Sequence, residues 1–379
     1  MSAKPISMVA LREGYLAQKP QIDAAVARVL DSGWYILGKE AAAFESDFAA
    51  WCDVRRAVGV GNGTDAIVIA LKSLGIGPGD AVFTVSHTAV ATVAAVEMAG
   101  ATPVLVDIDP ATYTIDPAKL EDAVRSFAAS GRHGQPRAVI AVHLYGQPCD
   151  LTALAELCKR FDLFLIEDCA QAHGALWQGR RVGSFGHMAS FSFYPTKNLG
   201  AFGDGGAVVT NDEGLAERAA AYRQYGWRER YLSDLAGMNT RLDEMHAAML
   251  GVRLLRLDEE IESRRKTAAS YDAALRDAID IPKVRESATH AYHLYVVRHA
   301  RRDHLAATLK AAGIGSGIHY PVPVHLQKAY AGRIALAPSG LEVTEKAARE
   351  VLSLPMHPFL EEEDVARVTA AVKNWAQSD

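Results

Sequence analysis

Short apolar runs alternate with longer amphipathic stretches between residues 55 and 210. The apolar runs are typical of strands and lie at residues 57–60, 81–86, 103–107, 138–144, 163–168, 190–194 and 207–210. Helix-like segments separate the earlier runs, at residues 64–74, 89–100 and 151–161. Strands that alternate with helices predict an α/β fold with a mostly parallel sheet covered on both faces. Near-continuous apolar runs are typical of such doubly buried strands.

The pattern changes after Asn211. Residues 240–278 contain no proline and a single glycine, Gly251, and their apolar positions recur at spacings of three and four residues. Such a stripe predicts one long amphipathic helix. Its members are Leu242, Met245, Met249, Val252 and Leu255.

The long helix leads into a different arrangement of elements. A strand at 293–299, a helix at 302–312 and a strand near 316–320 follow it. We therefore predict two domains. Residues 1–239 form an N-terminal arm and a large domain with a seven-stranded, mostly parallel sheet. Residues 240–379 form the bridging helix and a small α+β C-terminal domain.

Composition and charge narrow the function classes. Forty basic against 45 acidic residues give the 379-residue chain a formal net charge of −5, without any basic block. Nucleic acid is therefore not expected as a partner. No apolar stretch has the length of a membrane span, and the N-terminus lacks the apolar core of a signal peptide. The four cysteines have no disulfide or metal-ligand spacing, so we expect a cytoplasmic protein.

Ligands of open α/β sheets bind beyond the carboxyl ends of the strands, at helix N-termini, so the loops at those positions matter most. The first, "GVGNGTDA" (59–66), is rich in glycine and opens a helix. The backbone amides of Gly63, Thr64 and Asp65 are expected to point at an anion. The dinucleotide fingerprint fails here, because Thr64 stands where its last glycine belongs. An ordinary strand-to-helix turn explains this stretch equally well.

Two further loops carry candidate side chains. In "SHTAVA" (86–91), Thr88 can cap the next helix, and the imidazole of His87 can stack on an aromatic cofactor. In "LIEDCAQAHG" (165–174), Asp168 follows a second carboxylate, Glu167, and precedes Gln171 and a histidine. A buried carboxylate needs a cationic or hydrogen-bonding partner, which the protonated ring nitrogen of a cofactor can provide.

The stretch "SFSFYPTKNLGAFGDGG" (190–206) contains a lone lysine. Lys197 follows a strand of alternating serines and aromatics and precedes glycines that permit close backbone approach. Most loop lysines are solvent-exposed, so the stretch alone does not decide between a surface and a functional role.

Together these loops supply an anion cradle, a stacking ring, a carboxylate and an amine. Those are the parts that hold pyridoxal 5′-phosphate: the amine condenses with the aldehyde, and the carboxylate keeps the pyridine nitrogen protonated. Metal catalysis fits less well, because no histidine, cysteine and carboxylate cluster has ligand spacing, and no metal site is predicted. A serine hydrolase is disfavoured because the chain has no G-x-S-x-G elbow.

Taken in order, these motifs resemble the nucleotide-sugar aminotransferases of the DegT/DnrJ/EryC1/StrS group, within the aspartate-aminotransferase (fold type I) superfamily. The likeness covers essentially the whole chain. Besides the loops above it includes "LGKEAAAFESDFA" (37–49), "GMNTRLDEMHAA" (237–248) and "HYPVPVHLQKAY" (319–330). It implies an aspartate-aminotransferase-like fold, with a three-layer α/β/α large domain and the smaller α+β domain.

The resemblance also implies roles for the cofactor residues. Lys197 corresponds to the lysine that bonds to the cofactor and shuttles a proton. Asp168 corresponds to the partner of the pyridine nitrogen, and Gln171 to the residue near the ring hydroxyl. The phosphate is assigned to Gly63, Thr64 and Ser192.

Partners follow from the resemblance as well. Asn239 corresponds to an asparagine that reaches the phosphate of the neighbouring subunit's cofactor, which implies a homodimer with shared active sites. His319, Tyr320 and His325 correspond to the segment that contacts the nucleotide-sugar. The implied reaction is a ping-pong transfer of the amino group of L-glutamate, which leaves as 2-oxoglutarate, to the keto-sugar.

One departure from the family pattern concerns the second loop. Many members carry an aromatic residue directly after the threonine, where it stacks on the cofactor, but Ala89 stands there. We expect His87 to take over the stacking. The version "HTAVATVAAVE" (87–97) is similar to the branch that aminates C3 of dTDP-3-keto-6-deoxyhexoses.

Four alternatives stay open at this point. A 4-aminotransferase acting on a 4-keto sugar is the first. A sugar dehydratase of the same fold is the second, although such members carry histidine in place of Lys197. A non-catalytic regulator that binds pyridoxal phosphate is the third. The last is a general amino-acid aminotransferase, which needs an arginine for the α-carboxylate that the sequence does not identify.

Overall fold

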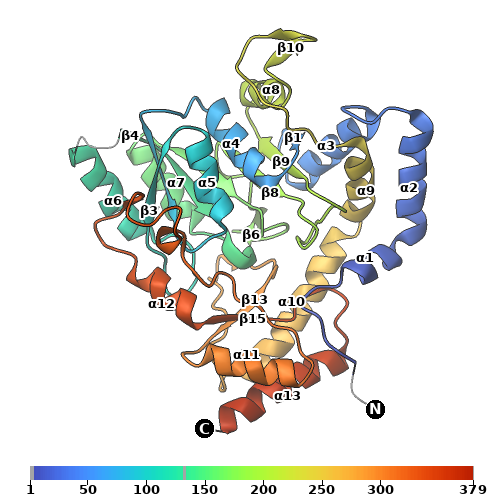
Figure 1. Ribbon diagram of the computed structural model, residues 1–379, viewed down its shortest axis with the longest axis vertical. Helices are drawn as coiled ribbons and strands as arrows, with labels where there is room; N and C mark the ends of the chain where they lie inside the picture. The colour runs from blue at the N-terminus through green and yellow to red at the C-terminus, as the bar shows by residue number, and fades with distance from the viewer. Residues whose placement is uncertain (1–3, 131–133, 379) are drawn as a thin grey trace.

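An eight-stranded sheet lies at the centre of the computed structural model, which describes residues 4–130 and 134–378 (Figure 1). Its strands stand in the order β1 (Arg56–Val60), β9 (Gly206–Thr210), β8 (Met188–Ser192), β5 (Phe164–Asp168), β4 (Gln135–Val142), β2 (Asp80–Val85), β3 (Thr102–Val106) and β14 (Ala335–Leu336). Only β9 runs antiparallel to its neighbours. All seven predicted strands are present, and the α/β class is confirmed. The short β14, from the second predicted domain, adds an eighth strand.

Six of the described helices pack against this sheet. They are α3 (Lys39–Trp51), α4 (Gly63–Ser73), α5 (Val90–Met98), α6 (Pro117–Ser130), α7 (Leu151–Arg160) and α8 (Glu213–Tyr222). Helix α4 contacts α5 and α8 on its sides and β8 and β9 beneath, which is why every residue from Ala66 to Leu71 is buried. Helices α6 and α7 pack together and cover β3, β4 and β5. The helix α4 is thereby held rigidly with its first turn at the carboxyl end of β8.

The predicted long helix at 240–278 is two helices, α9 (Glu244–Leu254) and α10 (Leu257–Leu275). Arg256, with φ −108° and ψ 0°, lies outside helical geometry and separates them. The two halves pack against different partners, α9 against α2 (Lys19–Ser32) and α3, and α10 against α13 (Glu362–Gln377). The break turns the apolar face from one partner to the other. Leu255, predicted in the apolar stripe, is 86% exposed at this break.

The C-terminal part is a smaller α+β layer below the sheet in Figure 1. It contains β13 (Tyr295–Arg298), α11 (Arg302–Ala311), α12 (Glu342–Glu350) and β15 (Val351–Leu354), with α1 (Leu11–Ala17) nearby. The expected strand near 316–320 is wrong: Gly317 forms one isolated bridge to Ser353. The remaining strands of the described chain are short: β6 (Leu176–Trp177), β7 (Arg180–Arg181), β10 (Trp227–Glu229), β11 (Leu232–Ser233) and β12 (Ala288–Thr289).

Apolar side chains form one large core around the sheet and a second core centred on Tyr271 and Tyr295. The membership of these cores crosses the predicted boundary at residue 239, because Ile6 belongs to the second core and Val351 to the first. The boundary therefore stays a prediction, and residues 1–3, 131–133 and 379 of the two predicted domains lie outside the described residues. Within the described chain, none of the helices combines the length and apolar character needed to span a membrane.

Candidate active site

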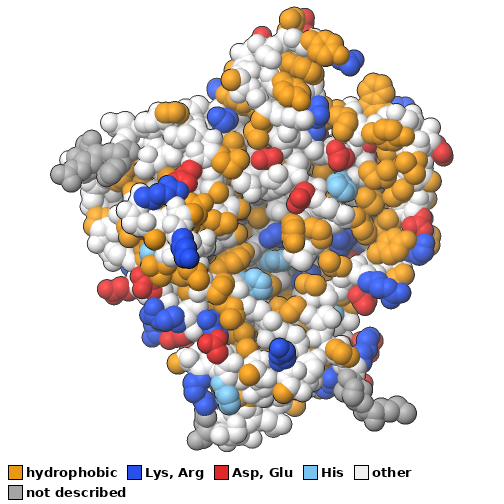
Figure 2. Space-filling model, viewed as in Figure 1, with side chains coloured by type: hydrophobic (Ala, Val, Ile, Leu, Met, Phe, Trp, Pro, Cys, Tyr) orange, Lys and Arg blue, Asp and Glu red, His pale blue; other side chains and the backbone are white. Residues whose placement is uncertain are grey.

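A cavity of about 620 Å³ opens where the carboxyl ends of β5 and β8 meet the first turn of α4. The middle of the visible face is hollowed, with histidine side chains inside the hollow (Figure 2). Ligands of open α/β sheets bind at this edge. Eight of the eleven predicted site residues line the cavity: Gly63, Thr64, Asp168, Gln171, Ser192, Lys197, His319 and Tyr320.

One end of the cavity is the first turn of α4. Asn62 caps this helix, and its Oδ1 accepts the backbone N–H of Asp65 at 2.9 Å. The prediction that the Asp65 amide points at an anion is therefore wrong, because the cap takes it. The first two helical amides, of Gly63 and Thr64, have no intrahelical acceptor and remain for an anion. A Cβ at Gly63 would lie 2.6 Å from the Cβ of Ser192, so only glycine allows β8 to approach this turn.

Asp168 is fixed at the end of β5. Its Oδ2 accepts the hydroxyl of Thr92 at 2.8 Å, and its Oδ1 accepts the backbone N–H of Ala170 at 3.1 Å. The side chain is buried and lines the cavity. Two neutral donors leave the negative charge of the carboxylate without a counterion from these contacts, which suits a cationic ring nitrogen.

Lys197 projects into the same cavity from the turn after β8. Its backbone N–H donates to the carbonyl of Tyr194 at 2.8 Å, and the next side chain, Asn198, donates through Nδ2 to the carbonyl of Ala291 at 3.1 Å. These bonds hold the turn that presents the amine. Burial lowers the pKa of Lys197 to about 8, although the Asp168 carboxylate acts in the opposite direction. An amine with this pKa is partly neutral near pH 7 and is able to act as a nucleophile or base.

A hydrogen-bond network links Gln171 to the other end of the cavity. The Oε1 of Gln171 accepts the backbone N–H of Tyr145 at 2.7 Å, so its Nε2 is the atom that donates to the Tyr320 hydroxyl at 2.9 Å. The hydroxyl of Tyr145 must donate to the carbonyl oxygen of His319, which only accepts. It therefore accepts from Nε2–H of His87, 2.8 Å away. Tyr145 thus connects three predicted residues.

Three predicted residues do not line the cavity. His87 is buried against Tyr145, and Ala89 lines the cavity beside it, so the stacking role of His87 stays a prediction. His325 is held by Ser86, whose Oγ lies 2.7 Å from its Nδ1. Asn239 is exposed, and its proposed reach into a neighbouring subunit also stays a prediction.

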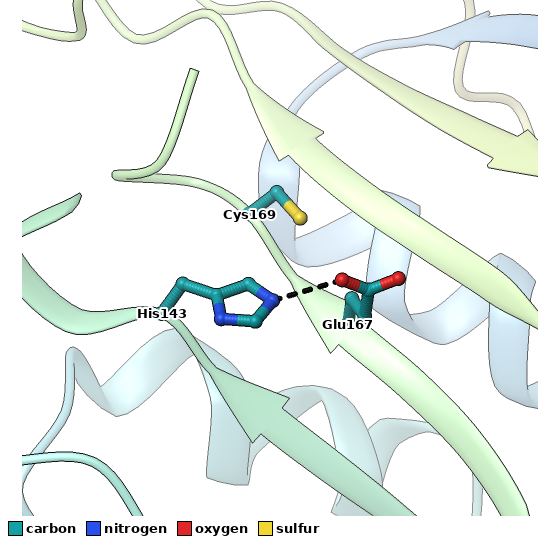
Figure 3. Close-up of side chains that lie close together, drawn as sticks. All are labelled: His143, Glu167 and Cys169. Atoms are coloured by element: carbon teal, nitrogen blue, oxygen red, sulfur yellow. Dashed lines mark hydrogen bonds and ion pairs between the residues drawn. The ribbon is translucent and has the colours of Figure 1, made fainter. Parts of the chain in front are cut away.

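The buried side chains of His143, Glu167 and Cys169 lie close together and are the one group with metal-ligand potential in the described residues (Figure 3). Their polar atoms already have partners. His143 Nδ1 accepts the backbone N–H of Cys149 at 3.0 Å, so its Nε2–H donates to Glu167. Glu167 also accepts the amides of residues 183, 185 and 186, each at 2.8 Å. Glu167 therefore orders the chain after β7, and we assign it a structural role.

Sequence reasoning missed Thr92, Tyr145 and His293. The predicted cap at Thr88 is wrong, because α5 begins after Ala89 with no side-chain cap. The Thr88 hydroxyl lies instead 3.1 Å from that of Thr92, which donates to Asp168. Tyr145 reaches the site through φ +63°, which no side-chain pattern indicates. His293 lines the cavity as the first residue of the predicted strand at 293–299, but the observed strand begins only at Tyr295, which leaves His293 outside it.

Residues 17–373 match the model of the DegT/DnrJ/EryC1/StrS aminotransferase family. The chain belongs to this family. It is 48% identical over 369 residues to the dTDP-3-amino-3,4,6-trideoxy-alpha-D-glucose transaminase of Streptomyces venezuelae. The matched region covers 97% of this chain and 95% of that protein. It is also 44% identical over 374 residues to a pleiotropic regulatory protein of Geobacillus stearothermophilus. That matched region covers 98% of each protein.

Solved structures show the same relationship. The S. venezuelae protein DesV, solved in complex with a ketimine intermediate, is 46% identical, with a TM-score of 0.94 over 99% of each chain. The expected aspartate-aminotransferase-like fold is therefore confirmed, as is the expectation of an aminotransferase with pyridoxal 5′-phosphate as its cofactor.

The described residues fit this cofactor. The glycine cradle at Gly63 accepts no side chain, and its two free amides with the hydroxyls of Thr64 and Ser192 suit a phosphate. At the other side of the cavity stand a carboxylate, Asp168, and an amine, Lys197. These groups match the three reactive parts of pyridoxal phosphate: its phosphate, its ring nitrogen and its aldehyde.

Proposed function

We propose that this protein transfers the amino group of L-glutamate to a nucleotide-linked keto-6-deoxysugar, at C3 of a dTDP-3-keto-6-deoxyhexose. The observation that carries the proposal is Lys197, whose amine shares one cavity with Asp168 and the first turn of α4. The choice of a sugar nucleotide and of C3 is supported by the S. venezuelae transaminase, whose name states a dTDP-3-amino sugar.

The chain's own residues supply binding and proton transfer. Gly63, Thr64 and Ser192 would hold the phosphate, and Asp168 would keep the ring nitrogen protonated. The bound cofactor supplies an electron sink for charge that develops at the carbon bearing the amine. Lys197 would hold the cofactor through its amine and, when a substrate amine takes that place, would accept or return one proton at Nζ. The same lysine acts in both halves of a ping-pong exchange.

The far end of the cavity is assigned to the sugar. His319 and Tyr320 line it, and Gln171 orients the Tyr320 hydroxyl by donating to its oxygen. Burial raises the pKa of Tyr320 to about 12, although the hydrogen bond from Gln171 acts in the opposite direction. The hydroxyl therefore keeps its proton at neutral pH and is able to donate it to an oxygen of the sugar. His325 contributes indirectly, because it is bonded to Ser86 and Glu345.

We further propose a homodimer in the cytoplasm, with Asn239 reaching the partner's cofactor. Asn239 is exposed on this chain, which leaves its side chain available to a second copy. The four cysteines are all free, as suits a reducing compartment. If the proposal is right, size-exclusion chromatography should give a dimer for the wild type and for Asn239→Ala, and the variant should retain the cofactor less well. Only monomers in solution would contradict it.

The test of function is a transamination assay with L-glutamate and paired dTDP-3-keto and dTDP-4-keto sugars. We expect a dTDP-3-amino sugar and 2-oxoglutarate. Activity only on the 4-keto sugar would move the reaction to C4. Loss of a hydroxyl without gain of nitrogen would indicate a dehydratase. Cofactor binding with no turnover on either sugar would favour the regulatory role that the name of the G. stearothermophilus relative states for that protein.

A further inference from the structure

His293 lies on the inner wall of the cavity, beside Lys197. The backbone around it is held by the turn at residues 145–146: Leu294 N–H donates to the carbonyl of Tyr145 at 3.2 Å, and Ala291 N–H donates to that of Gly146 at 2.9 Å. The backbone that carries this imidazole is therefore held by contacts between residues far apart in the sequence.

The polar atoms of this imidazole lack partners. The side chain is 8% exposed, and its Nδ1 is buried with no hydrogen-bond partner among the described residues. Neither ring nitrogen forms a hydrogen bond with the described residues that would fix the tautomer. Nδ1 is fully buried, but Nε2 is not among the buried unpartnered atoms. A buried polar group without a partner costs free energy, so such a group inside a ligand cavity points to a bound ligand.

The groups that face His293 are cationic or neutral. Burial lowers the pKa of His293 well below its ordinary value, and the positive charges of Lys197 and Arg264 and the rings of His319 and His173 act in the same direction. Arg264, on α10, gives its guanidinium to two carbonyl groups, of Tyr292 at 3.3 Å and Met356 at 2.9 Å. Its charge is offset only in part by Glu260. This wall attracts an anion.

An amino-acid donor needs a partner for its carboxylate, and arginine is the usual choice. Among the residues that line the cavity, Lys197 is the only lysine or arginine, and it is assigned to the cofactor. The carboxylates that line the cavity, of Asp65, Asp168 and Asp204, repel a second carboxylate. Among the lining residues, His293 is the one with a buried side-chain polar atom that has no hydrogen-bond partner in the described residues.

We propose that the imidazole of His293 is a substrate-binding group that donates a hydrogen bond to a carboxylate of the amino-acid donor. The proposal rests on the proposed function, which requires such a donor. A carboxylate beside the ring stabilises its protonated form, so the ring takes up a proton as the ligand binds. Affinity should therefore rise as the pH falls below the ordinary range of histidine, until the ligand itself is protonated.

Glutarate is the probe, because it has the two carboxylates of glutamate but no amine to react. Its binding to the holoenzyme is measured by calorimetry at about pH 6 in two buffers of different ionisation enthalpy, which reports proton uptake. His293→Leu should weaken binding at least about tenfold and abolish the uptake, because a hydrogen bond to a charged group is lost. His293→Gln should restore part of the affinity but none of the uptake.

The matched control is His357→Leu. His357 is also 8% exposed and has an unpartnered Nδ1, and the charge of Arg264 lowers its pKa as well. It does not line the cavity. We expect unchanged glutarate binding. Equal affinity and uptake in His293→Leu and the wild type would overturn the proposal, as would a wild type that does not bind glutarate. Should His293→Leu fail to fold, His293→Gln with undiminished uptake overturns it as well.

This binding measurement is independent of turnover. If glutarate binds through His293 but no amino group reaches any nucleotide keto-sugar, the proposed function fails and the carboxylate subsite stands. If transamination proceeds and His293→Leu has the wild-type KM for glutamate, the subsite fails and the function stands.

Discussion

The two ends of the cavity are built in different ways. The cofactor end consists of the first turn of α4 and the residues that end β5 and β8, each placed by the strand or helix that it terminates. The sugar end is assembled from separate segments around residues 145, 171, 293 and 319, which long-range hydrogen bonds hold together. The first is inherent in the α/β layout, whereas the second depends on the C-terminal part being in place.

The largest effect is expected at the cofactor end. Lys197→Ala removes the amine that we propose to bond to the cofactor and to carry the proton. Turnover should fall by at least about 1,000-fold, because general acid–base and covalent catalysis are lost together. Steady-state kinetics measure the loss. The variant should still bind pyridoxal phosphate reversibly through the phosphate and Asp168, and an active variant would remove Lys197 from the mechanism.

The second prediction tests the glycine cradle. A Cβ in Gly63→Ala would lie 2.6 Å from the Cβ of Ser192. We expect about a tenfold loss of pyridoxal phosphate affinity, because overpacking costs about 1–3 kcal/mol and displaces the phosphate ligands. Fluorescence titration of the cofactor-free protein measures this.

Gly251→Ala is the matched control for the cradle. Gly251 lies within α9, and a Cβ there meets nothing within 4 Å. This variant should keep its cofactor affinity and raise the free energy of unfolding by about 0.5–1 kcal/mol. A cofactor affinity in Gly63→Ala as high as in Gly251→Ala would show that the close approach is unimportant.

The third prediction addresses the sugar end. Tyr145→Phe removes the hydroxyl that joins His87 to the carbonyl of His319. The KM for the keto-sugar should rise about tenfold, with cofactor retention unchanged, because a buried hydrogen bond that positions the segment at 319–320 is lost. The control is Tyr113→Phe, whose ring centroid is 5.9 Å from that of Tyr145 and whose hydroxyl forms no hydrogen bond with the described residues. Equal keto-sugar KM values for Tyr145→Phe and Tyr113→Phe would show that the Tyr145 hydroxyl does not position the sugar end.

The two ends of the cavity also differ in how well the sequence predicts them. Gly63, Asp168 and Lys197 follow or precede predictable strands and helices, so the pattern of apolar runs was enough to place them together. Tyr145 and His293 reach the cavity through backbone geometry and contacts far apart in sequence, which no local pattern encodes. The same limit explains the division of the predicted long helix into α9 and α10, because the break serves partners that pack from elsewhere.

The smallest effect concerns pH. Burial lowers the pKa of Lys197 to about 8, so roughly a tenth of its amine is neutral at about pH 7 and most of it above about pH 9. Only the neutral amine attacks the aldehyde, so the rate of cofactor loading should rise with pH and level off above about pH 8. Stopped-flow absorbance measures that rate. A profile that rises up to the ordinary lysine range would mean that Lys197 is not desolvated.

The central claim is that Lys197 is the residue that bonds to the cofactor. Reduction of the holoenzyme with borohydride, followed by proteolysis and mass spectrometry, tests it directly. The account predicts a phosphopyridoxyl group on the peptide that contains Lys197 and on no other lysine peptide. A label on a different lysine, or no label on a protein that contains the cofactor, would contradict the account.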